Sequence, residues 1–212
     1  MTRVISTISI SLDGYVAGPD PSLEDPIGVG GMQLHQWVFK LKSWREPHAG
    51  YEGGEETASD AVVREQLDAT GAYVMGRRMF SGGEGPWEDD GNGNGWWGDD
   101  PPFHLPVFVL THHEREPLTL SDTTFHFVTG GIEDAIAQAS AAAGDKAVHI
   151  SGGAEAIQQS IAAGLLDELE LHLVPVLLGS GRRLLENLGT DARFELTRVV
   201  DTPDVTHLRY AL

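Results

Sequence analysis

Residues 147–164, AVHISGGAEAIQQSIAAG, decide the fold predicted for this chain. The apolar run 147–150 indicates a buried strand, and the following residues favour a helix from about Ala154 to Ala163, which Gly164 ends. The glycine pair 152–153 joins the two, and glycine permits both a sharp turn and close approach of a ligand to the backbone. A helix N-terminus also favours phosphate through its free N–H groups and its dipole. The segment therefore predicts either a phosphate seat or a glycine turn needed for packing alone.

Strands and helices alternate on both sides of this unit, which predicts a largely parallel α/β sheet with an antiparallel end in a single domain over residues 1–212. Ser59 or Asp60 is the expected N-cap of the second helix. Strands are predicted over 4–11, 72–75, 106–110, 125–128, 147–150 and 169–175, helices over 33–45, 59–70, 132–143 and 154–163, and a closing hairpin over 194–200 and 206–211.

Composition excludes several classes of function. The net charge of −18 argues against nucleic-acid binding and against anionic membranes as partners. The chain has no cysteine, which excludes disulfides, thiolate metal sites and a cysteine nucleophile. Its nine histidines show no HxH, HxxxH or HExxH spacing, so no metal site is expected. No signal-peptide layout and no apolar run of about 18 residues are present, so we expect a soluble cytoplasmic protein.

Two arginine pairs follow glycines and could hold an anion. In YVMGRRMF (73–80) an apolar strand leads into Gly76 and then Arg77 and Arg78, whose guanidinium forks suit phosphate. The other interpretation is a pair of ordinary surface ion pairs. In LGSGRRL (178–184) the glycines and arginines indicate either a second anion cradle or a tight turn before a short helix.

The first predicted strand ends at Leu12-Asp13-Gly14, a turn signal. Ligands of open α/β sheets bind beyond the carboxyl ends of the strands, so Asp13 could polarise a substrate there. The alternative is an Asx turn without a catalytic role.

Taken in order, four stretches resemble the dihydrofolate reductase-like superfamily, and within it the group related to the C-terminal reductase domain of riboflavin biosynthesis. The resemblance implies a three-layer α/β/α fold with a mixed, mostly parallel central sheet and an antiparallel C-terminal hairpin. It also implies NADPH across the strand ends and a homodimer, with 169–178 and the closing hairpin as its interface. The stretches are SLDGYVAG (11–18), YVMGRRMF (73–80), VFVLTHH (107–113) and HISGGAEAIQQSIAAGLLDELELHLVPVLLGSGRRLLE (149–186).

The resemblance further implies how residues divide along NADPH. The segment 76–78 would contact the adenosine-side phosphates, 110–113 the adenosine 2′-phosphate, and 151–156 the pyrophosphate, while the loop at 12–14 would close over the nicotinamide. Asp13, or a water that it holds, is the candidate for proton delivery. The candidate cofactor residues are Leu12, Gly14, Gly76, Arg77, Arg78, Leu110, Thr111, His112, His113, Ser151, Gly152, Gly153, Ala154, Glu155 and Ala156.

Two departures from the family pattern bear on the substrate. The predicted helix 33–45 has no carboxylate to grip a pterin, so folate reduction is not expected. Insertions at about 19–57 and 82–104 bring tryptophans that either wall a substrate pocket or pack the insertions onto the core. Trp37 and Arg182 are the expected substrate contacts.

The leading hypothesis is an NADPH-dependent oxidoreductase that reduces a small planar or heterocyclic substrate by hydride transfer. A second hypothesis is the riboflavin-pathway reductase, whose phosphorylated ribosylamino-pyrimidine would place its phosphate on Arg182 and Arg183. A third is a nucleotide-binding module without catalysis, which would bind the cofactor but turn nothing over.

Overall fold

The computed structural model describes residues 2–22, 24–48, 50–83, 85–87, 93–186, 188–189 and 192–212 of the chain. Its strands are β1 Val4–Ser11, β2 Tyr15–Ala17, β3 Thr70–Gly76, β4 Val107–Leu110, β5 Leu118–Leu120, β6 Thr123–Val128, β7 Ala147–Gly152, β8 Glu168–Val174, β9 Arg182–Arg183, β10 Glu195–Asp201 and β11 Thr206–Ala211. Its helices are the 3₁₀ helix η1 Gly31–His35 and the α-helices α1 Lys42–Arg45, α2 Ala58–Ala69, α3 Arg77–Ser81, α4 Gly131–Ala143 and α5 Ala154–Ala162.

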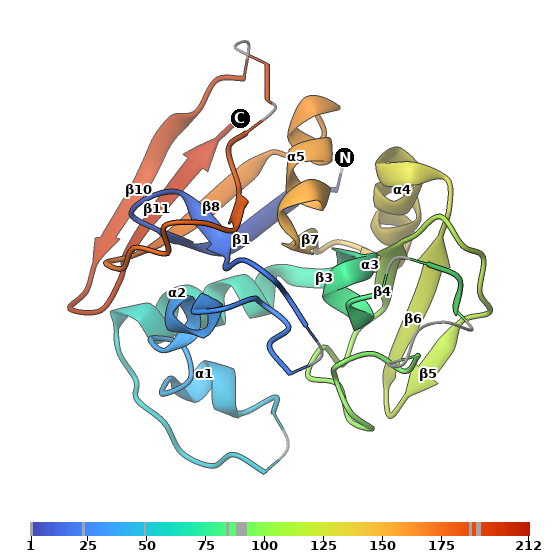
Figure 1. Cartoon of the computed structure of the whole chain (residues 1–212), viewed down its shortest axis with the longest axis horizontal. Coiled ribbons are helices and arrows are strands. Elements are labelled where there is room, and N and C mark those ends of the chain that lie inside the picture. Colours follow the sequence, from blue (N-terminus) through green and yellow to red (C-terminus); the bar gives the residue numbers. More distant parts are fainter. Residues whose placement is uncertain are drawn as a thin grey trace.

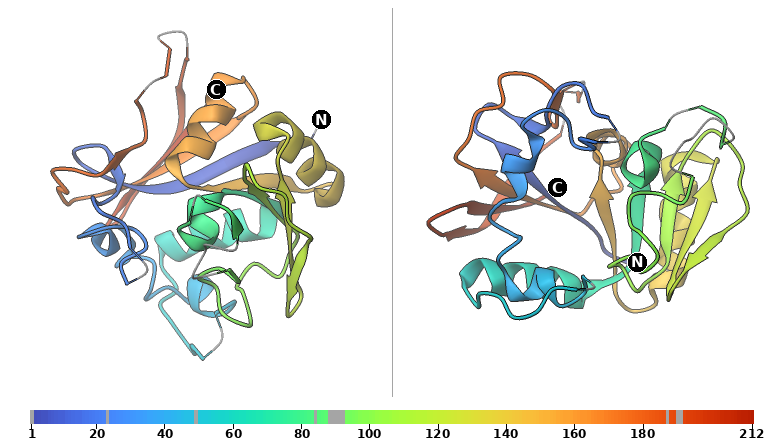
Figure 2. Two further views of the ribbon diagram at one scale, coloured as in Figure 1. Left: turned by 45° about the vertical axis from the view of Figure 1, so that its right-hand side comes forward. Right: turned by 60° about the horizontal axis from the view of Figure 1, so that its bottom comes forward.

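The main sheet has nine strands in the order β10-β11-β8-β1-β7-β3-β4-β6-β5. The six strands from β8 to β6 run parallel to one another, and the hairpin β10–β11 adds antiparallel at one edge. This confirms the predicted mixed, mostly parallel sheet and its C-terminal hairpin. The short strand β5 closes the other edge, antiparallel to β6, and was not predicted. Figure 2 shows the hairpin and β5 at opposite ends of the sheet.

Helices cover both faces of this sheet, which confirms the three-layer arrangement. In Figure 1, α4 and α5 lie on one side of the central strands, and α2 and α1 lie on the other. The face under α4 and α5 is built from alternate strand residues such as Val74, Val148 and Leu169. Because successive strand residues point to opposite faces, the intervening residues meet α2, Trp87 or the segment 97–105. No helix in the described parts of the chain is long and apolar enough to cross a membrane.

The helix predicted over 33–45 is wrong. The chain forms the 3₁₀ helix η1, a series of turns and then the four-residue α1. Leu41 has an extended backbone and forms an isolated bridge with Glu55, which interrupts the helix. Leu34, Trp37 and Leu41 are nevertheless all buried, so turns can bury apolar residues at helical spacing as well as a helix does.

The predicted cap of α2 is also wrong. The cap is Thr57, whose side-chain oxygen accepts a hydrogen bond from the backbone of Asp60 at 3.2 Å. Ser59 and Asp60 are buried and have other partners: the carboxylate of Asp60 accepts from the backbone of Ser43 at 2.6 Å.

The expectation of a short helix after the glycines 179 and 181 is wrong as well. Arg182 and Arg183 form β9, which pairs antiparallel with β2 in a separate two-stranded sheet. Gly181 has a φ of +126°, and a Cβ there would lie 2.1 Å from the carbonyl oxygen of Ala17. The close approach of β2 and β9 therefore requires glycine at this position.

Candidate active site at the carboxyl ends of the strands

The segments singled out in the sequence meet at one edge of the sheet. Because β1, β3, β4, β7 and β8 are parallel, their carboxyl ends lie on the same side. Residues 12–14, 77–78, 111–113, 153–156 and 175–183 leave the sheet there. The order in which strands are added to the sheet also changes direction here: β3 lies on one side of the pair β1–β7 and β8 lies on the other. Such a switch point is where open α/β sheets bind ligands.

Gly152 and Gly153 form an open stretch of backbone at the centre of this edge. The peptide bond between them is cis, and Gly152 has a φ of +132° with the sulfur of Met79 3.1 Å from where its Cβ would lie. A Cβ on Gly153 would meet no atom within 4 Å. One on Gly76 would lie 3.7 Å from the Gly153 nitrogen and would begin to cover it. Glycine at 76 and 153 thus leaves the backbone of Gly153 exposed at the N-terminus of α5.

Three charged side chains from distant parts of the chain converge beside the glycines. Glu155, in the first turn of α5, places a carboxylate oxygen 3.1 Å from a guanidinium nitrogen of Arg182 and 3.9 Å from one of Arg78. All three side chains are exposed. The structure therefore brings Arg182 to the predicted cofactor residues.

Arg77 differs from its neighbour Arg78 in being buried. Its guanidinium carbon lies 3.4 Å from the centre of the Trp87 ring, and the group donates a hydrogen bond to the hydroxyl of Ser81. This position ties α3 to the segment that carries Trp87. Arg78 is thus the arginine of the pair that reaches the open strand edge.

The segment after β4 forms a compact turn. Thr111 is buried, and its backbone N–H donates to the carbonyl of Val128 at 3.1 Å. The indole nitrogen of Trp87 donates to the carbonyl of His113 at 2.9 Å, while His112 is exposed. An open hollow of about 510 Å³ adjoins this turn, lined by Glu114, Arg115, Glu116, Phe127 and Thr129.

Asp13 is engaged with its own surroundings. Its carboxylate accepts hydrogen bonds from the hydroxyl of Ser11 at 2.5 Å and from the backbone N–H groups of Gly179 at 2.7 Å and Leu178 at 3.2 Å. The Ser11 hydrogen bond and those two N–H groups lower the pKa of Asp13 to about 2. Asp13 is therefore ionised at neutral pH and anchors the loop after β8. The geometry does not support proton delivery from this carboxyl.

Trp37 does not face an open pocket. It is buried, its indole nitrogen donates to the hydroxyl of Ser9 at 3.1 Å, and its ring packs edge-on against His172 and His207. The structure therefore does not support the expectation that Trp37 contacts the substrate, because its ring is enclosed by protein. Trp87 and Trp97 likewise pack on the half-buried Phe127 and Phe103, which favours the packing interpretation of the tryptophans.

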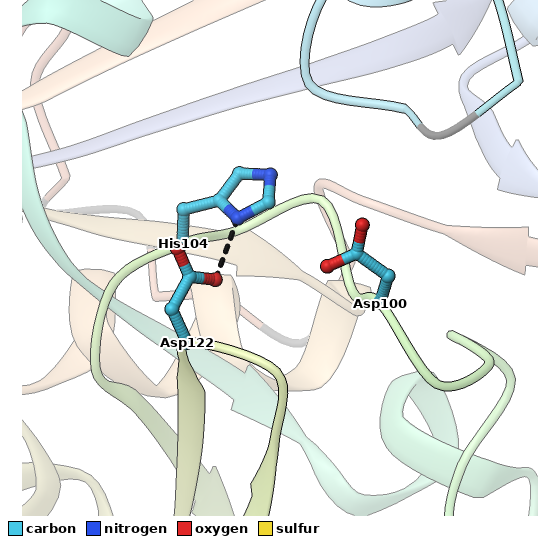
Figure 3. A group of neighbouring side chains, drawn as sticks. All are labelled: Asp100, His104 and Asp122. Carbon is cyan, nitrogen blue, oxygen red and sulfur yellow. Dashed lines mark hydrogen bonds and ion pairs between the residues drawn. The ribbon is translucent and has the colours of Figure 1, made fainter.

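Asp100, His104 and Asp122 form an exposed cluster elsewhere on the molecule, with possible ligand atoms within 4.8 Å of one another (Figure 3). The two ring nitrogens of His104 lie 2.6 Å from the Asp122 carboxylate and 3.2 Å from the carbonyl of Pro47. Both partners are acceptors, so both nitrogens must donate, as they do in the imidazolium cation. The Asp122 hydrogen bond accordingly raises the pKa of His104. The cluster is accounted for as an ion pair.

Sequence reasoning missed the pairing of Tyr15 with Arg183, because two-residue strands carry no periodic signal. The guanidinium carbon of Arg183 lies 4.5 Å from the centre of the Tyr15 ring, and the group donates to the tyrosine hydroxyl at 3.2 Å.

The family model for the RibD C-terminal domain matches residues 2–208. The chain belongs to this family. No curated protein matches the chain significantly.

Three solved structures illustrate the similarity of fold. A protein from Shewanella sp. PV-4 assigned to riboflavin biosynthesis is 23% identical, with a TM-score of 0.64, over 100% of this chain and 98% of its own. The Thermotoga maritima diaminohydroxyphosphoribosylaminopyrimidine deaminase/5-amino-6-(5-phosphoribosylamino)uracil reductase is 11% identical, with a TM-score of 0.57, over 99% of this chain and 56% of its own. Dihydrofolate reductase from Enterococcus faecalis, solved with NADP(H), is 12% identical, with a TM-score of 0.52, over 99% of this chain and 95% of its own. At these identities the three similarities show a shared fold.

Proposed function

We propose that this protein is an NADPH-dependent reductase that transfers hydride to a small planar or heterocyclic substrate. The observation that carries the proposal is the uncovered Gly153 backbone, opposite Gly76 and at the N-terminus of α5, with Arg78 and Arg182 beside it. Membership of the RibD C-terminal domain family supports a reductase. The similar fold of a dihydrofolate reductase that binds NADP(H) supports the cofactor.

The residues present suit a dinucleotide phosphate. A pyrophosphate would lie on the Gly153 amide and the first turn of α5, where N–H groups lack intrahelical acceptors. Arg78 and Arg182 would bind phosphate oxygens once Glu155 releases them. Ser151, Gly152, Ala154 and Ala156 would complete this seat, and Leu110–His113 the adenosine end. NADPH, when bound, supplies the hydride, and the protein supplies position and a water-poor surrounding.

The loop 12–14 has a positioning role in this proposal. Asp13 fixes the backbone of Leu178 and Gly179, and the backbone of Leu184 donates to the carbonyl of Gly14 at 3.3 Å. Leu12 and Gly14 are thereby held in place at the end of β1, where they would contact the nicotinamide.

Replacement of Gly153 tests the cofactor seat. The Gly153→Ala methyl group meets no protein atom within 4 Å, so the free energy of unfolding should change by less than about 0.5 kcal/mol. The methyl group would occupy the space of the phosphate, so the Kd for NADPH, measured by calorimetry, should rise by about 10-fold or more.

The matched control is Gly189→Ala, whose Cβ also meets no atom within 4 Å. It should leave the Kd for NADPH unchanged. Equal NADPH affinity in Gly153→Ala and the wild type, or no NADPH binding by the wild type, would contradict the proposal.

Glu155→Gln tests the charge arrangement at the same seat. The variant keeps the side-chain shape but removes the carboxylate that pairs with Arg182 at 3.1 Å and with Arg78 at 3.9 Å; such exposed ion pairs contribute at most about 1 kcal/mol. NADPH should therefore bind up to ~5-fold more tightly at low ionic strength, with the gain declining as salt rises. Weaker binding by Glu155→Gln would show that the carboxylate itself contacts the cofactor.

A reductase acting on a phosphorylated ribosylamino-pyrimidine is a second candidate function, favoured by the family match. Oxidation of NADPH that depends on this substrate would establish it. A nucleotide-binding module would instead bind NADPH without turnover of any carbonyl, imine or dihydropterin compound.

We also propose a homodimer formed through the edge strand β10. The side chains of Leu196 and Val199 on this strand are about half exposed, and Phe194 just before the strand is exposed as well. Light scattering should give about twice the monomer mass of 22.9 kDa, and Val199→Glu should lower the measured mass to that of the monomer. A wild-type monomer would rule this assembly out.

A further inference from the structure

β9 sends its two arginines to different places. Arg182 pairs with Glu155 beside the glycine pair, whereas Arg183 lies over the ring of Tyr15. Adjacent strand residues point to opposite sides, so the separation follows from the pairing of β9 with β2. An arginine that faces away from the phosphate seat needs another explanation.

Arg183 lines an open hollow of about 330 Å³ at the end of β1. Three aliphatic side chains contribute to it, and two of them, Leu12 and Leu185, are more than half exposed. Exposed leucines at a concave surface are typical of a ligand site. The lining residues are Ile10, Leu12, Asp13, Gly14, Arg183 and Leu185.

The guanidinium of Arg183 is held in place without a carboxylate. The Tyr15 ring and hydroxyl fix it, and among the described residues no carboxylate forms an ion pair with it, although the chain has 32 acidic residues. Asp13 lines the same hollow, but its oxygens accept from Ser11 and from the backbone of 178–179. The guanidinium therefore keeps N–H groups available for an oxyanion.

Gly14 lies next to this guanidinium at the turn after β1. It has a φ of +86°, a conformation that favours glycine. A Cβ there would lie 3.4 Å from a guanidinium nitrogen of Arg183, which is ordinary van der Waals contact.

We propose that this hollow is the substrate subsite, and that it takes a molecule with a flat apolar body bearing one oxyanion, either carboxylate or phosphate. Leu12 and Leu185 cover the apolar body, and Arg183 binds two oxygens of the anionic group through its planar fork. This inference rests on the proposed reductase function, since it assigns the second ligand of that reaction. It also divides the arginine pair: Arg182 serves the cofactor and Arg183 the substrate.

Phenyl phosphate and benzoate are suitable probes, because each carries one oxyanion on a flat ring. Binding of each probe to the full chain is measured by NMR or calorimetry, with and without NADPH, in the wild type and in the matched variants Arg183→Met and Arg182→Met. Arg183→Met should weaken probe binding by about 10-fold or more and change the Kd for NADPH less than threefold. Arg182→Met should show the reverse pattern. Arg183→Lys should restore binding only in part, because it lacks the fork.

The two arms separate the possible sources of the oxyanion. Preference for phenyl phosphate identifies a phosphorylated substrate, and preference for benzoate a carboxylated one. Tyr15→Phe, which keeps the ring and removes the hydroxyl, should weaken binding by a smaller factor. Probe binding that survives Arg183→Met, or a wild type that binds neither probe, would overturn the subsite. Failure of NADPH binding with Arg183-dependent probe binding intact would overturn the reductase function alone.

Discussion

The two faces of the main sheet hold the fold together by different means. On β8, Leu169 and Leu171 point into the aliphatic core under α4 and α5. Glu170 and His172, between and beside them, are equally buried but lie on the face that α2 covers. The same strand therefore contributes to an apolar core on one side and to a polar cluster on the other.

The face that α2 covers is polar, and each buried charged group or imidazole that β7, β8 and β11 place there has a hydrogen-bonding partner. Glu170 accepts hydrogen bonds from Arg198 at 3.0 Å and from Arg209 at 2.8 Å. The rings of His172 and His207 lie 2.8 Å apart, nitrogen to nitrogen, and His149 accepts from the backbone of Thr7 at 3.2 Å. Hydrogen-bonded groups depend on geometry, whereas apolar packing depends mainly on volume. The α2 face therefore specifies one arrangement of the chain, while the α4–α5 face supplies non-directional burial.

Removal of Glu170 should have the largest effect. Glu170→Ala removes the buried carboxylate and leaves Arg198 with Glu65, and Arg209 with Glu65 and Glu168, so the free energy of unfolding should fall by about 3–5 kcal/mol. Urea denaturation measures this. Glu170→Gln keeps hydrogen-bond acceptance by one oxygen and should lose less. A loss below about 1 kcal/mol in Glu170→Ala would show that the charged cluster does not anchor this face.

Truncation of the neighbouring leucine tests the apolar face. Leu169→Ala removes a side chain that is 1% exposed, and the resulting cavity should cost about 3 kcal/mol. Leu169→Met should cost less than about 1.5 kcal/mol, since it conserves volume. If both substitutions cost the same, the contrast between tolerant and specific faces would be lost.

A fall in pH should lower the free energy of unfolding through His149, which is buried on the face that α2 covers. Burial lowers the pKa of His149 to about 3, and its ring nitrogen accepts a backbone N–H, so the folded state holds it neutral. The unfolded chain protonates it near its ordinary pKa of 6.5, so its stabilising contribution is complete above pH 6.5 and is lost as the pH falls from 6.5 toward 3. Between pH 7 and pH 5 the loss is about 2 kcal/mol.

His149→Gln should reduce the fall in unfolding free energy over that pH range by this amount, as measured by urea denaturation at several pH values. The same substitution at exposed His112 is the control and should change the free energy of unfolding at pH 7 by less than about 0.5 kcal/mol. A wild-type slope in His149→Gln would contradict the assignment.

The smallest expected effect concerns the bond between Trp37 and Ser9. Ser9→Ala leaves the buried indole N–H without its acceptor and should cost about 1–2 kcal/mol in unfolding free energy. The tryptophan fluorescence of the folded variant should shift, because one buried indole loses its partner. A neutral substitution would mean that packing against His172 and His207 alone fixes the ring.

Most of the sheet could be predicted from sequence, because alternation along strands such as β1 and β11 is a local signal. The failures occurred where tertiary contacts override that signal. The residues of 33–45 keep helical spacing, yet Leu41 pairs with Glu55 and the helix breaks. Thr57, Ser59 and Asp60 are all suitable caps by type, and only the burial of the last two selects Thr57.

The candidate site could be predicted as a set of segments but not as a set of contacts. Glycines at 76, 152 and 153 mark where strands leave the sheet, and parallel strands bring those ends together. The sequence does not show in which direction a side chain points. It therefore cannot tell that Arg77 is buried and Arg78 exposed, or that Asp13 anchors a loop and does not serve as a proton donor.

The pairing of β9 with β2 has an evolutionary consequence. Because side chains alternate along a strand, one residue inserted or deleted between Gly179 and Arg182 would exchange the directions of Arg182 and Arg183. Gly181 now fits against the carbonyl oxygen of Ala17, and a slip would put a side chain into that contact. The length of this loop therefore determines which arginine faces which ligand, and relatives with an insertion or deletion here are expected to bind different ligands.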